Sequence, residues 1–314
     1  MKGLGVAEKF FDRFGLPAIR EHFPEMVGRI SAGLIGRGSE VLEADDELSR
    51  DHGWGPRFCQ FVDEDDIRGI GQEMQEKLNA LRPSVFEGIN LLEHRTETIA
   101  VSTIDECFRD LTGAPWPPET IREWAFVNEN GLCYAQMGRI FYDPTDQLRA
   151  RKQAFEKAYY PEPIWKWRVA SKLYQLWHYG DYNTRGRLAR RNDGVAALVG
   201  QGYFVEAAMQ LAFLMNRRFA PYWKWLHWGF TQLPYIATEL EPLLVELESA
   251  PDLGTRADLI GAICDLYRRV LCDQGIFPDS NWRNFMGSFE IVDSIQDTEV
   301  RELIECYFDQ YKHL

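Results

Sequence analysis

The segment from Ile30 to Val62 constrains the fold more than any other, because it combines two apolar strands with a glycine turn between them. The first strand is predicted over Ile30–Ile35 and the second over Trp54–Val62. A glycine turn leads through Gly38 into Ser39, where a short helix is expected to begin. Backbone N–H groups at a turn of this kind bind anions, so the turn is a candidate phosphate site.

An acidic residue, Asp51, lies at the start of the second predicted strand. Alternate residues of a strand point to one face, and two carboxylates placed in this way can hold two divalent metal ions about 3.5 to 4 Å apart. Here the alternate position is Gly53, which has no side chain to bind a metal or to accept a proton. In a regular strand, His52 points to the face opposite Asp51. A packing role and a catalytic role are both consistent with that position.

Helical and strand patterns surround this segment, and the second half of the chain is helical throughout. Helices are predicted over Val6–Phe14 (ending at Gly15 and Pro17), Ala18–Val27 and Asp63–Leu81, and strands over Ser84–Ile89 and Thr96–Ser102. From Gln147 onward the apolar residues recur at helical spacing. We therefore predict an α+β fold, with an α/β domain and mixed sheet over residues 1–146 and an all-helical domain over residues 147–314. A ligand cleft is expected between the two domains.

Two motifs resemble a known superfamily. The sequence GRGSEVLEADDELSRDHGWGPR, residues 36–57, resembles the signature of the nucleotidyltransferase fold, the superfamily of kanamycin nucleotidyltransferase and DNA polymerase beta. It is more similar still to an uncharacterised bacterial branch with the motif Ser-Arg-Asp-His-Asp-Trp-Gly-Pro. The sequence FVEAAMQLAFLMNRRFAPYWKW, residues 204–225, is similar to the helical domain of that branch. The resemblance spans about residue 20 to about residue 230.

The resemblance implies roles for particular residues. Gly38 and Ser39 would bind phosphate, and Asp51 would be the first metal-binding carboxylate. The second carboxylate would stand at Gly53 and is missing, and the third would come from a later strand, as Glu97 or Glu87. Protein sites for Mg²⁺ use one or two carboxylates together with the substrate phosphates, so the loss of one weakens metal binding severely.

Composition and charge narrow the range of partners. The 314 residues are 45% hydrophobic and 26% charged, which is typical of a soluble globular protein, and no run approaches the ~18 to 20 apolar residues of a membrane span. The formal charge of −13 disfavours nucleic acid and anionic membranes as partners and favours a small molecule or a protein. Six scattered cysteines without a CxxC pair, and no signal peptide, predict reduced thiols in a cytoplasmic protein.

An arginine cluster follows Tyr182 and Asn183 in the helical half. Solvation or pairing with acids is the default role of such a cluster, and phosphate binding is the sharper alternative. Its members are Arg185, Arg187, Arg190 and Arg191.

A second group of candidates follows an apolar helix, where cations can satisfy helix carbonyls without any further function. The resemblance places Arg217 and Arg218 at the cofactor, and Tyr222 and Lys224 in the cleft as catalytic groups. The aromatic residues near them are expected either to pack in the core or to line a pocket for a bulky apolar ligand. They are Trp223, Trp225, Trp228 and Phe230.

Three functions remain open. In the first, the chain modifies a bulky small molecule by acid–base chemistry that requires no cofactor, such as cyclisation or condensation of a natural-product intermediate, through Asp51, His52, Tyr222 and Lys224. In the second, it transfers a nucleotide from a nucleoside triphosphate (NTP) to a small acceptor, using Mg²⁺ and a replacement acid such as Glu97. In the third, it binds a ligand without catalysis. We favour the first, because one carboxylate is deleted from an otherwise preserved motif.

Overall fold

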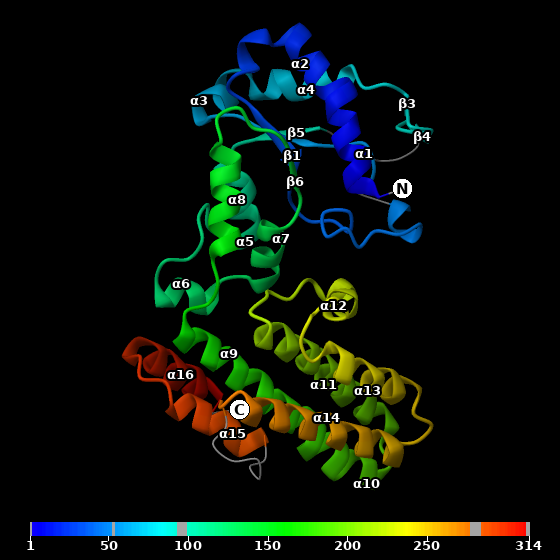
Figure 1. Cartoon of the computed structure of the whole chain (residues 1–314), viewed down its shortest axis with the longest axis vertical. Helices are drawn as coiled ribbons and strands as arrows, with labels where there is room; N and C mark the ends of the chain where they lie inside the picture. The colour runs from blue at the N-terminus through cyan, green and yellow to red at the C-terminus, as the bar shows by residue number, and fades with distance from the viewer. Residues whose placement is uncertain (1, 52–53, 93–98, 277–283, 312–314) are drawn as a thin grey trace. The chain divides into compact units, whose positions relative to one another are not determined.

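A computed structural model of the chain describes residues 2–51, 54–92, 99–276 and 284–311. The chain forms two compact units (Figure 1). Unit 1 comprises residues 1–118 and 127–158, and unit 2 comprises residues 119–126 and 159–314. The division predicted after residue 146 falls just before a helix, α8 (Gln147–Lys157), and α8 packs against α7 (Glu129–Gln136) of unit 1.

Unit 1 begins with one continuous helical segment that runs past the predicted stop. It consists of α1 (Gly3–Phe10), the π-helical turn η1 (Phe11–Gly15) and α2 (Leu16–His22), followed by the short 3-10 turn η2 (Pro24–Met26). A proline inside a helix lacks an N–H donor, and its ring clashes with the carbonyl four residues earlier. Here Pro17 stands in the first turn of α2, directly after the wider π-helical turn, and the helix continues.

The sheet of unit 1 has four strands in the order β5-β2-β1-β6. The pairs β1–β2 and β1–β6 are antiparallel, whereas β2–β5 is parallel, so the sheet is mixed. The strands are β1 (Ser31–Leu34), β2 (Cys59–Phe61), β5 (Ala100–Ser102) and β6 (Arg139–Tyr142). The predicted strand over Ile30–Ile35 is confirmed as β1, whereas the second predicted strand is shorter than expected and starts only at Cys59.

Helices cover the sheet and enclose an aromatic core. Phe10 and Phe11 of the first helical segment are fully buried, and Phe11 meets Phe58 edge to face with ring centroids 5.2 Å apart. Met74 and Leu78 approach the same core from α4 (Gln72–Ala80). The core therefore joins the N-terminal helices to the strands that carry the glycine turn.

Most other elements of unit 1 lie between β2 and β6 in the sequence, whereas η3 lies between β1 and β2. The predicted helix over Asp63–Leu81 forms as three consecutive helical segments, and the predicted strand over Ser84–Ile89 is instead a small hairpin. The remaining elements are η3 (Leu48–Asp51), α3 (Glu64–Asp66), η4 (Ile67–Gly71), β3 (Val85–Phe86), β4 (Ile89–Asn90) and α5 (Ile104–Thr112).

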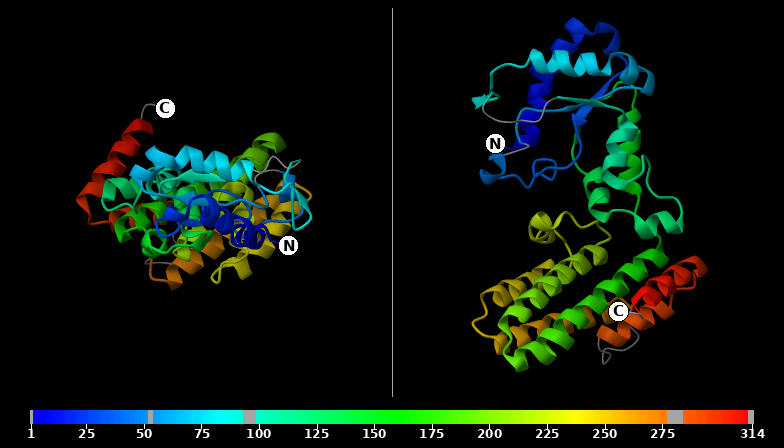
Figure 2. Two further views of the ribbon diagram at one scale, coloured as in Figure 1. Left: turned by 90° about the horizontal axis from the view of Figure 1, so that it is seen from above. Right: turned by 180° about the vertical axis from the view of Figure 1, so that it is seen from behind.

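Unit 2 is helical throughout its described residues. Its long helices pack side by side, with α11 against α9 and α13 against α14 (Figure 2). Its elements are α6 (Ile121–Phe126), α9 (Glu162–Gln175), η5 (Leu176–Leu188), α10 (Ala189–Arg191), α11 (Gly194–Met215), α12 (Trp223–Phe230), α13 (Ala237–Ser249), α14 (Leu253–Asp273), α15 (Asn284–Asp293) and α16 (Thr298–Tyr311). The prediction of an α+β chain with a helical C-terminal part is confirmed.

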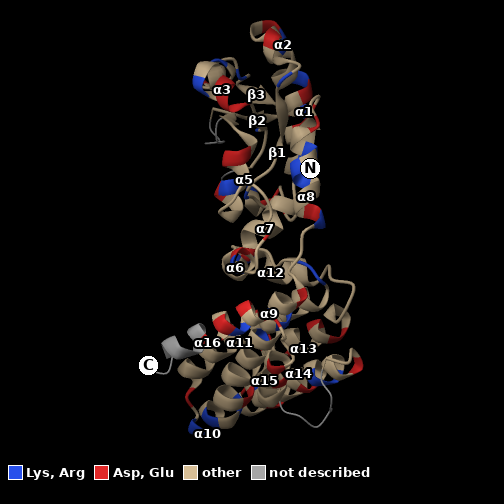
Figure 3. Cartoon of the chain, turned by 90° about the vertical axis from the view of Figure 1, so that its left-hand side faces the viewer, with Lys and Arg blue, Asp and Glu red and all other residues tan. Residues whose placement is uncertain are grey.

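One helix, α11, has the length and the hydropathy of a membrane span, although the sequence was expected to contain none. Its apolar window is 61% buried inside unit 2, and Phe204, Leu211 and Leu214 lie in the core. A buried, uniformly apolar helix is also what the core of a water-soluble helical protein requires. Acidic and basic residues are interspersed along the helices of each unit, as the colours of Figure 3 show.

A π-helix of 13 residues, η5, continues from α9. Side chains along it donate to backbone carbonyl groups five positions earlier: Asn183 Nδ2 donates to His178 O (2.9 Å), and Thr184 Oγ1 donates to Tyr179 O (2.6 Å). Long π-helices are rare, since each needs side chains that satisfy or cover its widened turns. The polar side chains of the Tyr182-Asn183 region thus stabilise the local backbone.

Candidate functional site

The end of the sheet of unit 1 holds a pocket of about 780 Å³ beside the glycine turn. Its walls come from the end of β1, the turn itself, β2, β5 and α5. Charged, polar and thiol groups line it, together with apolar residues of the strands: Arg37, Arg57, Cys59, Ser102, Glu106, Cys107 and Asp110. A pocket of this size accommodates a small molecule as large as a nucleotide.

A buried ion pair fixes the turn to the next strand. Arg57 donates from Nε to Glu40 Oε1 (3.0 Å) and also from Nη2 to the same oxygen. The side chains of Glu40 and Arg57 are only 1% and 12% exposed. Arg57 Nη2 also lies 3.4 Å from Arg37 O. One guanidinium therefore holds both sides of the glycine turn, in the forked geometry that suits arginine.

The glycine turn has a backbone that other residues rarely adopt. Gly36 and Gly38 have φ angles of +134° and +151°. A Cβ atom at Gly38 would lie 2.8 Å from Glu40 Oε2 and 3.1 Å from Arg57 Nη2, whereas a Cβ atom at Gly36 would meet open space. The glycines thus let the turn approach the buried ion pair.

The helix expected at Ser39 does not form, because the chain closes into turns instead, with Ala44 N donating to Ser39 O (2.9 Å). Within the described part of the chain, no backbone N–H group from Gly36 to Ser39 donates a hydrogen bond. These donors therefore remain available to a ligand, although the dipole of a following helix does not reinforce them.

Arg37 of the glycine turn and Cys107 of α5 contribute a cation and a thiol to the pocket. Arg37 is exposed, and it donates from Nη2 to Asp110 O (3.0 Å) at the end of α5. Its planar fork has five donors, so most remain available. Burial raises the pKa of the Cys107 thiol well above its ordinary value, and the nearby Cys59 and Asp110 raise it further. Cys107 is therefore a neutral thiol near pH 7.

The acidic connection after the turn is mostly structural. Asp45 is buried and accepts hydrogen bonds from Gly3 N and Trp54 Nε1, both at 2.8 Å. Asp46 accepts from Ser49, and these hydrogen bonds lower the pKa of Asp46. Asp46 thus serves as a local hydrogen-bond acceptor within this connection.

The candidate metal ligands lie mainly outside the described residues. Asp51 ends η3 and does not belong to a strand, so the argument from alternate strand positions does not apply to the described backbone. His52, Gly53 and Glu97 lie outside the described residues, and their assignments stay predictions. Glu87 does not line the pocket; it lies in the turn of the β3–β4 hairpin.

Glu87 is held there by two cations from the first helical segment. Arg13 Nη1 lies 2.5 Å from Glu87 Oε1, and Lys9 Nζ lies 3.9 Å from Glu87 Oε2. These ion pairs tie the hairpin to the N-terminal helices.

The described residues alone do not fit a metal ion at this pocket. Glu106 is committed to capping α5, since its Oε2 accepts from Thr103 N (3.0 Å) while Thr103 Oγ1 accepts from Glu106 N. Glu40 is committed to Arg57. Over the described ranges, no group of three His, Cys, Asp or Glu side chains could hold a metal. We derive no reaction step through a metal.

The candidates of unit 2 lie around the start of α12. Arg217 donates from Nη2 to Glu162 Oε2 (2.9 Å), and its guanidinium stacks 3.6 Å from the ring centroid of Trp165. Tyr222 is 45% exposed at the N-cap of α12, and Lys224 Nζ lies 5.3 Å from the Trp225 ring.

Arg218 is exposed, and its backbone N–H donates to Phe213 O. Arg217 thus has structural partners, whereas Tyr222, Lys224 and Arg218 project from the surface of unit 2. Binding or catalytic roles for these residues remain predictions.

The arginine cluster of η5 and α10 is partly engaged within unit 2. Arg185 Nη1 donates to Asp181 Oδ1 (2.9 Å), which raises the pKa of Arg185. The Arg187 guanidinium lies 3.8 Å from the centroid of the Tyr182 ring. These contacts fit the default expectation of solvation and pairing better than a phosphate site.

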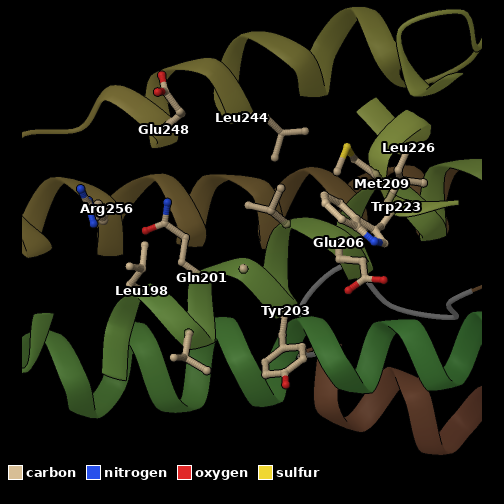
Figure 4. A pocket seen from close by; sticks show the side chains of 13 residues that line it. Leu198, Gln201, Tyr203, Glu206, Met209, Trp223, Leu226, Leu244, Glu248 and Arg256 are labelled. Carbon is tan, nitrogen blue, oxygen red and sulfur yellow. The ribbon is translucent and has the colours of Figure 1, made fainter. Parts of the chain in front are cut away.

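The aromatic group after Arg218 divides between core and surface. Phe230 is fully buried, whereas Trp223 is 67% exposed and lines a second pocket, about 760 Å³ in volume, in unit 2. Figure 4 shows this pocket, to which α11, α12, α13 and α14 contribute side chains.

Comparison with known proteins adds two findings. The sequence profile of a domain of unknown function, DUF4037, matches residues 124–226. This range contains the stretch 204–225 whose resemblance to a bacterial helical domain is described above, but it excludes the glycine turn. A search of curated proteins finds no match to this chain.

Among solved structures, the chain is similar to a nucleotidyltransferase-like protein from Exiguobacterium sibiricum 255-15. The two chains are 11% identical, with a TM-score of 0.38, over 89% of this chain and 75% of the other. A TM-score of this size does not establish a shared fold, so the fold rests on the sheet and helices described above.

Sequence reasoning missed three of the groups that shape the first pocket. Arg57 closes the motif SRDHGWGPR but was given no role, and Glu40 follows Ser39 directly. The signal in the sequence was the presence of two opposite charges, Glu40 and Arg57, in one short segment. Charged residues are almost never fully buried unless they are paired. Asp110 had no signal, because α5 brings it to the pocket from a distant part of the chain.

Proposed function

We propose that this protein is an enzyme that modifies a small molecule and binds a phosphate group of that molecule at the glycine turn. One observation carries the proposal: Gly36 and the exposed cation Arg37 of the glycine turn line a pocket of about 780 Å³, and the backbone N–H groups of residues 36–39 donate no hydrogen bond within the described chain. Gly38 and Ser39 belong to the same turn but do not line the pocket. Backbone donors and an arginine together favour a phosphate over a carboxylate or a neutral group.

The reaction proposed is acid–base chemistry that requires no metal, such as cyclisation or condensation of an intermediate. Asp51 and His52 are the proposed proton acceptor and donor, because they belong to the motif that contains the turn. Tyr222 and Lys224 are proposed as orienting groups. The substrate would be bulky, and the protein would act in the cytoplasm without nucleic acid or membrane as partner.

A second candidate is nucleotide transfer, which the size and the cationic rim of the pocket also favour. An acceptor oxygen would attack the α-phosphorus of an NTP, and pyrophosphate would leave. Asp51 and Glu97 would be the residues that hold Mg²⁺, which would neutralise the charge of the triphosphate.

Titration calorimetry separates the two candidates. Each of the common NTPs is titrated with and without Mg²⁺, and the Gly53→Asp variant is measured beside the wild-type protein. The favoured reaction predicts phosphate binding that Mg²⁺ leaves nearly unchanged. Tight, strictly Mg²⁺-dependent binding of an NTP would contradict it and support nucleotide transfer, above all if Gly53→Asp strengthens that binding further. Absence of binding to any phosphate compound would overturn both candidates.

A further inference from the structure

The second pocket, in unit 2, is a groove between α11, α12 and α13, with Arg256 of α14 at one end. Large apolar side chains lie exposed along it: Leu198 is 64% exposed, Val199 58%, Tyr203 51% and Trp223 67%. Monomeric soluble proteins rarely expose so many large apolar side chains in one place unless the place binds something.

Two carboxylates and an amide oxygen lie among the polar groups of the groove. Glu206 and Glu248 line it, and within the described part of the chain neither carboxylate has a cationic partner. Glu206 Oε1 accepts only from the neutral Gln210 Nε2 (3.2 Å). Gln201 Nε2 donates to Leu247 O (3.4 Å), which leaves Gln201 Oε1 as a buried acceptor without a partner.

Arg256 is the one cation among the lining residues, and its Nε donates to Ala250 O (3.3 Å). Two carboxylates and one guanidinium give the groove a net negative charge. An occupant that complements the groove therefore carries positive charge and hydrogen-bond donors.

Figure 4 shows how the groups lie. Trp223, Glu206 and Tyr203 gather near one end of the groove, while Glu248, Gln201 and Arg256 lie toward the other. The Tyr203 ring stacks on the Tyr179 ring, with centroids 4.8 Å apart, so Trp223 supplies the open ring near Glu206. An exposed aromatic ring near a carboxylate is an arrangement that binds organic cations, because the ring face attracts a cation whose apolar groups it also buries.

We infer that this groove binds an apolar organic amine or ammonium ion, with its cationic group beside Glu206 and its apolar body along Leu198, Met209 and Leu244. The site lies wholly within unit 2 and does not depend on the function proposed for the glycine turn.

Calorimetry with three ligands of the same carbon skeleton tests the inference: 4-phenylbutylamine, 4-phenylbutanol and 4-phenylbutyrate. The amine is expected to bind at least about tenfold more tightly than the alcohol, and the carboxylate not to bind, with binding of the amine weakened by added salt. Equal binding of amine and alcohol, or no binding of the amine, would overturn the inference.

Two variants assign the site. Glu206→Gln and Trp223→Ala are each expected to weaken binding of the amine about tenfold. Glu246→Gln, an exposed position on α13 outside the groove, removes the same charge and is expected to leave binding unchanged. All three side chains lie at the surface or in the groove, and circular dichroism checks that each variant folds. Equal loss in Glu206→Gln and Glu246→Gln would overturn the assignment.

A lipid surface is the other occupant that exposed apolar residues could serve. Sedimentation with phosphatidylcholine vesicles measures whether the protein binds a lipid surface. Vesicle binding that Trp223→Ala abolishes, in a protein that does not bind the amine, would assign the groove to a membrane and overturn the inference.

Discussion

Arg57 and Glu40 form a buried ion pair that clamps the glycine turn, with Arg57 Nε 3.0 Å from Glu40 Oε1 and the glutamate side chain 1% exposed. Breaking such a pair leaves a charge buried without its partner, which costs about 3 to 5 kcal/mol. We expect Arg57→Met to lower the free energy of unfolding by about that amount.

Urea denaturation measures the change, and a surface pair provides the control. Arg68 and Asp65 pair with side chains 68% and 91% exposed, so Arg68→Met is expected to cost less than ~1 kcal/mol. The double variant Glu40→Leu/Arg57→Met should recover much of the stability. Equal effects of Arg57→Met and Arg68→Met would show that the clamp is not a buried pair.

Gly38 needs a backbone conformation that few other residues adopt, and it also needs space. Gly38→Ala is expected to destabilise the protein by about 1 to 3 kcal/mol, because its Cβ would press on Glu40 and Arg57. Gly36→Ala has a similar φ but open space, so its cost is expected to be smaller. Thermal unfolding measures the stability of the two variants. A larger loss of stability in Gly36→Ala than in Gly38→Ala would contradict the geometry.

Three thiols are expected to be unreactive near neutral pH, because desolvation disfavours their thiolates although Cys107 and Cys133 are only partly buried. Desolvation raises the pKa of Cys107 and Cys264 well above the ordinary range and that of Cys133 to about 12. The thiolate is the nucleophile, so iodoacetamide is expected to label these cysteines slowly in the native protein and quickly after denaturation. Peptide mass mapping over time measures both rates. Rapid native labelling of Cys107 would show that the wall of the pocket opens.

Asp252 caps the N-terminus of α14, and its hydrogen bonds to Thr255 lower its pKa below 3.8. The pKa of Asp252 is lower in the folded than in the unfolded chain, so its negative charge stabilises the fold at pH values above the unfolded-state pKa. This stabilisation is lost as the pH falls through the folded-state pKa. The Tm of Asp252→Asn is therefore expected to lie below that of the wild type at about pH 6, and this difference is expected to shrink steadily as the pH is lowered below the ordinary pKa of an aspartate. A difference that grows on acidification would contradict this sign.

Those features of the fold that depend on local periodicity could be predicted from the sequence. The strand β1 follows from a mostly apolar run between Arg29 and Gly36, and the helices after Gln147 follow from apolar residues at helical spacing. The late start of β2 could not be predicted. Trp54 opens an alternating apolar pattern, but its ring donates to Asp45 instead of entering the sheet.

The sites were harder to predict, because each depends on contacts between distant segments. The motif located the glycine turn, but the clamp that fixes it and the helix α5 that faces it required the tertiary structure. In unit 2, α11 is apolar on nearly every side, so its sequence does not reveal that Leu198, Val199 and Tyr203 are exposed while Phe204 is buried. The groove follows from that difference.

The most direct test of the proposed function is calorimetric titration of inorganic triphosphate into the wild-type protein and into Arg37→Gln. Arg20→Gln, an exposed position on α2 outside the pocket, is the control for the lost charge. We expect binding in the wild type, a loss of about tenfold in affinity in Arg37→Gln, and no change in Arg20→Gln. No binding in the wild type, or equal weakening in the two variants, would show that the glycine turn is not a phosphate site.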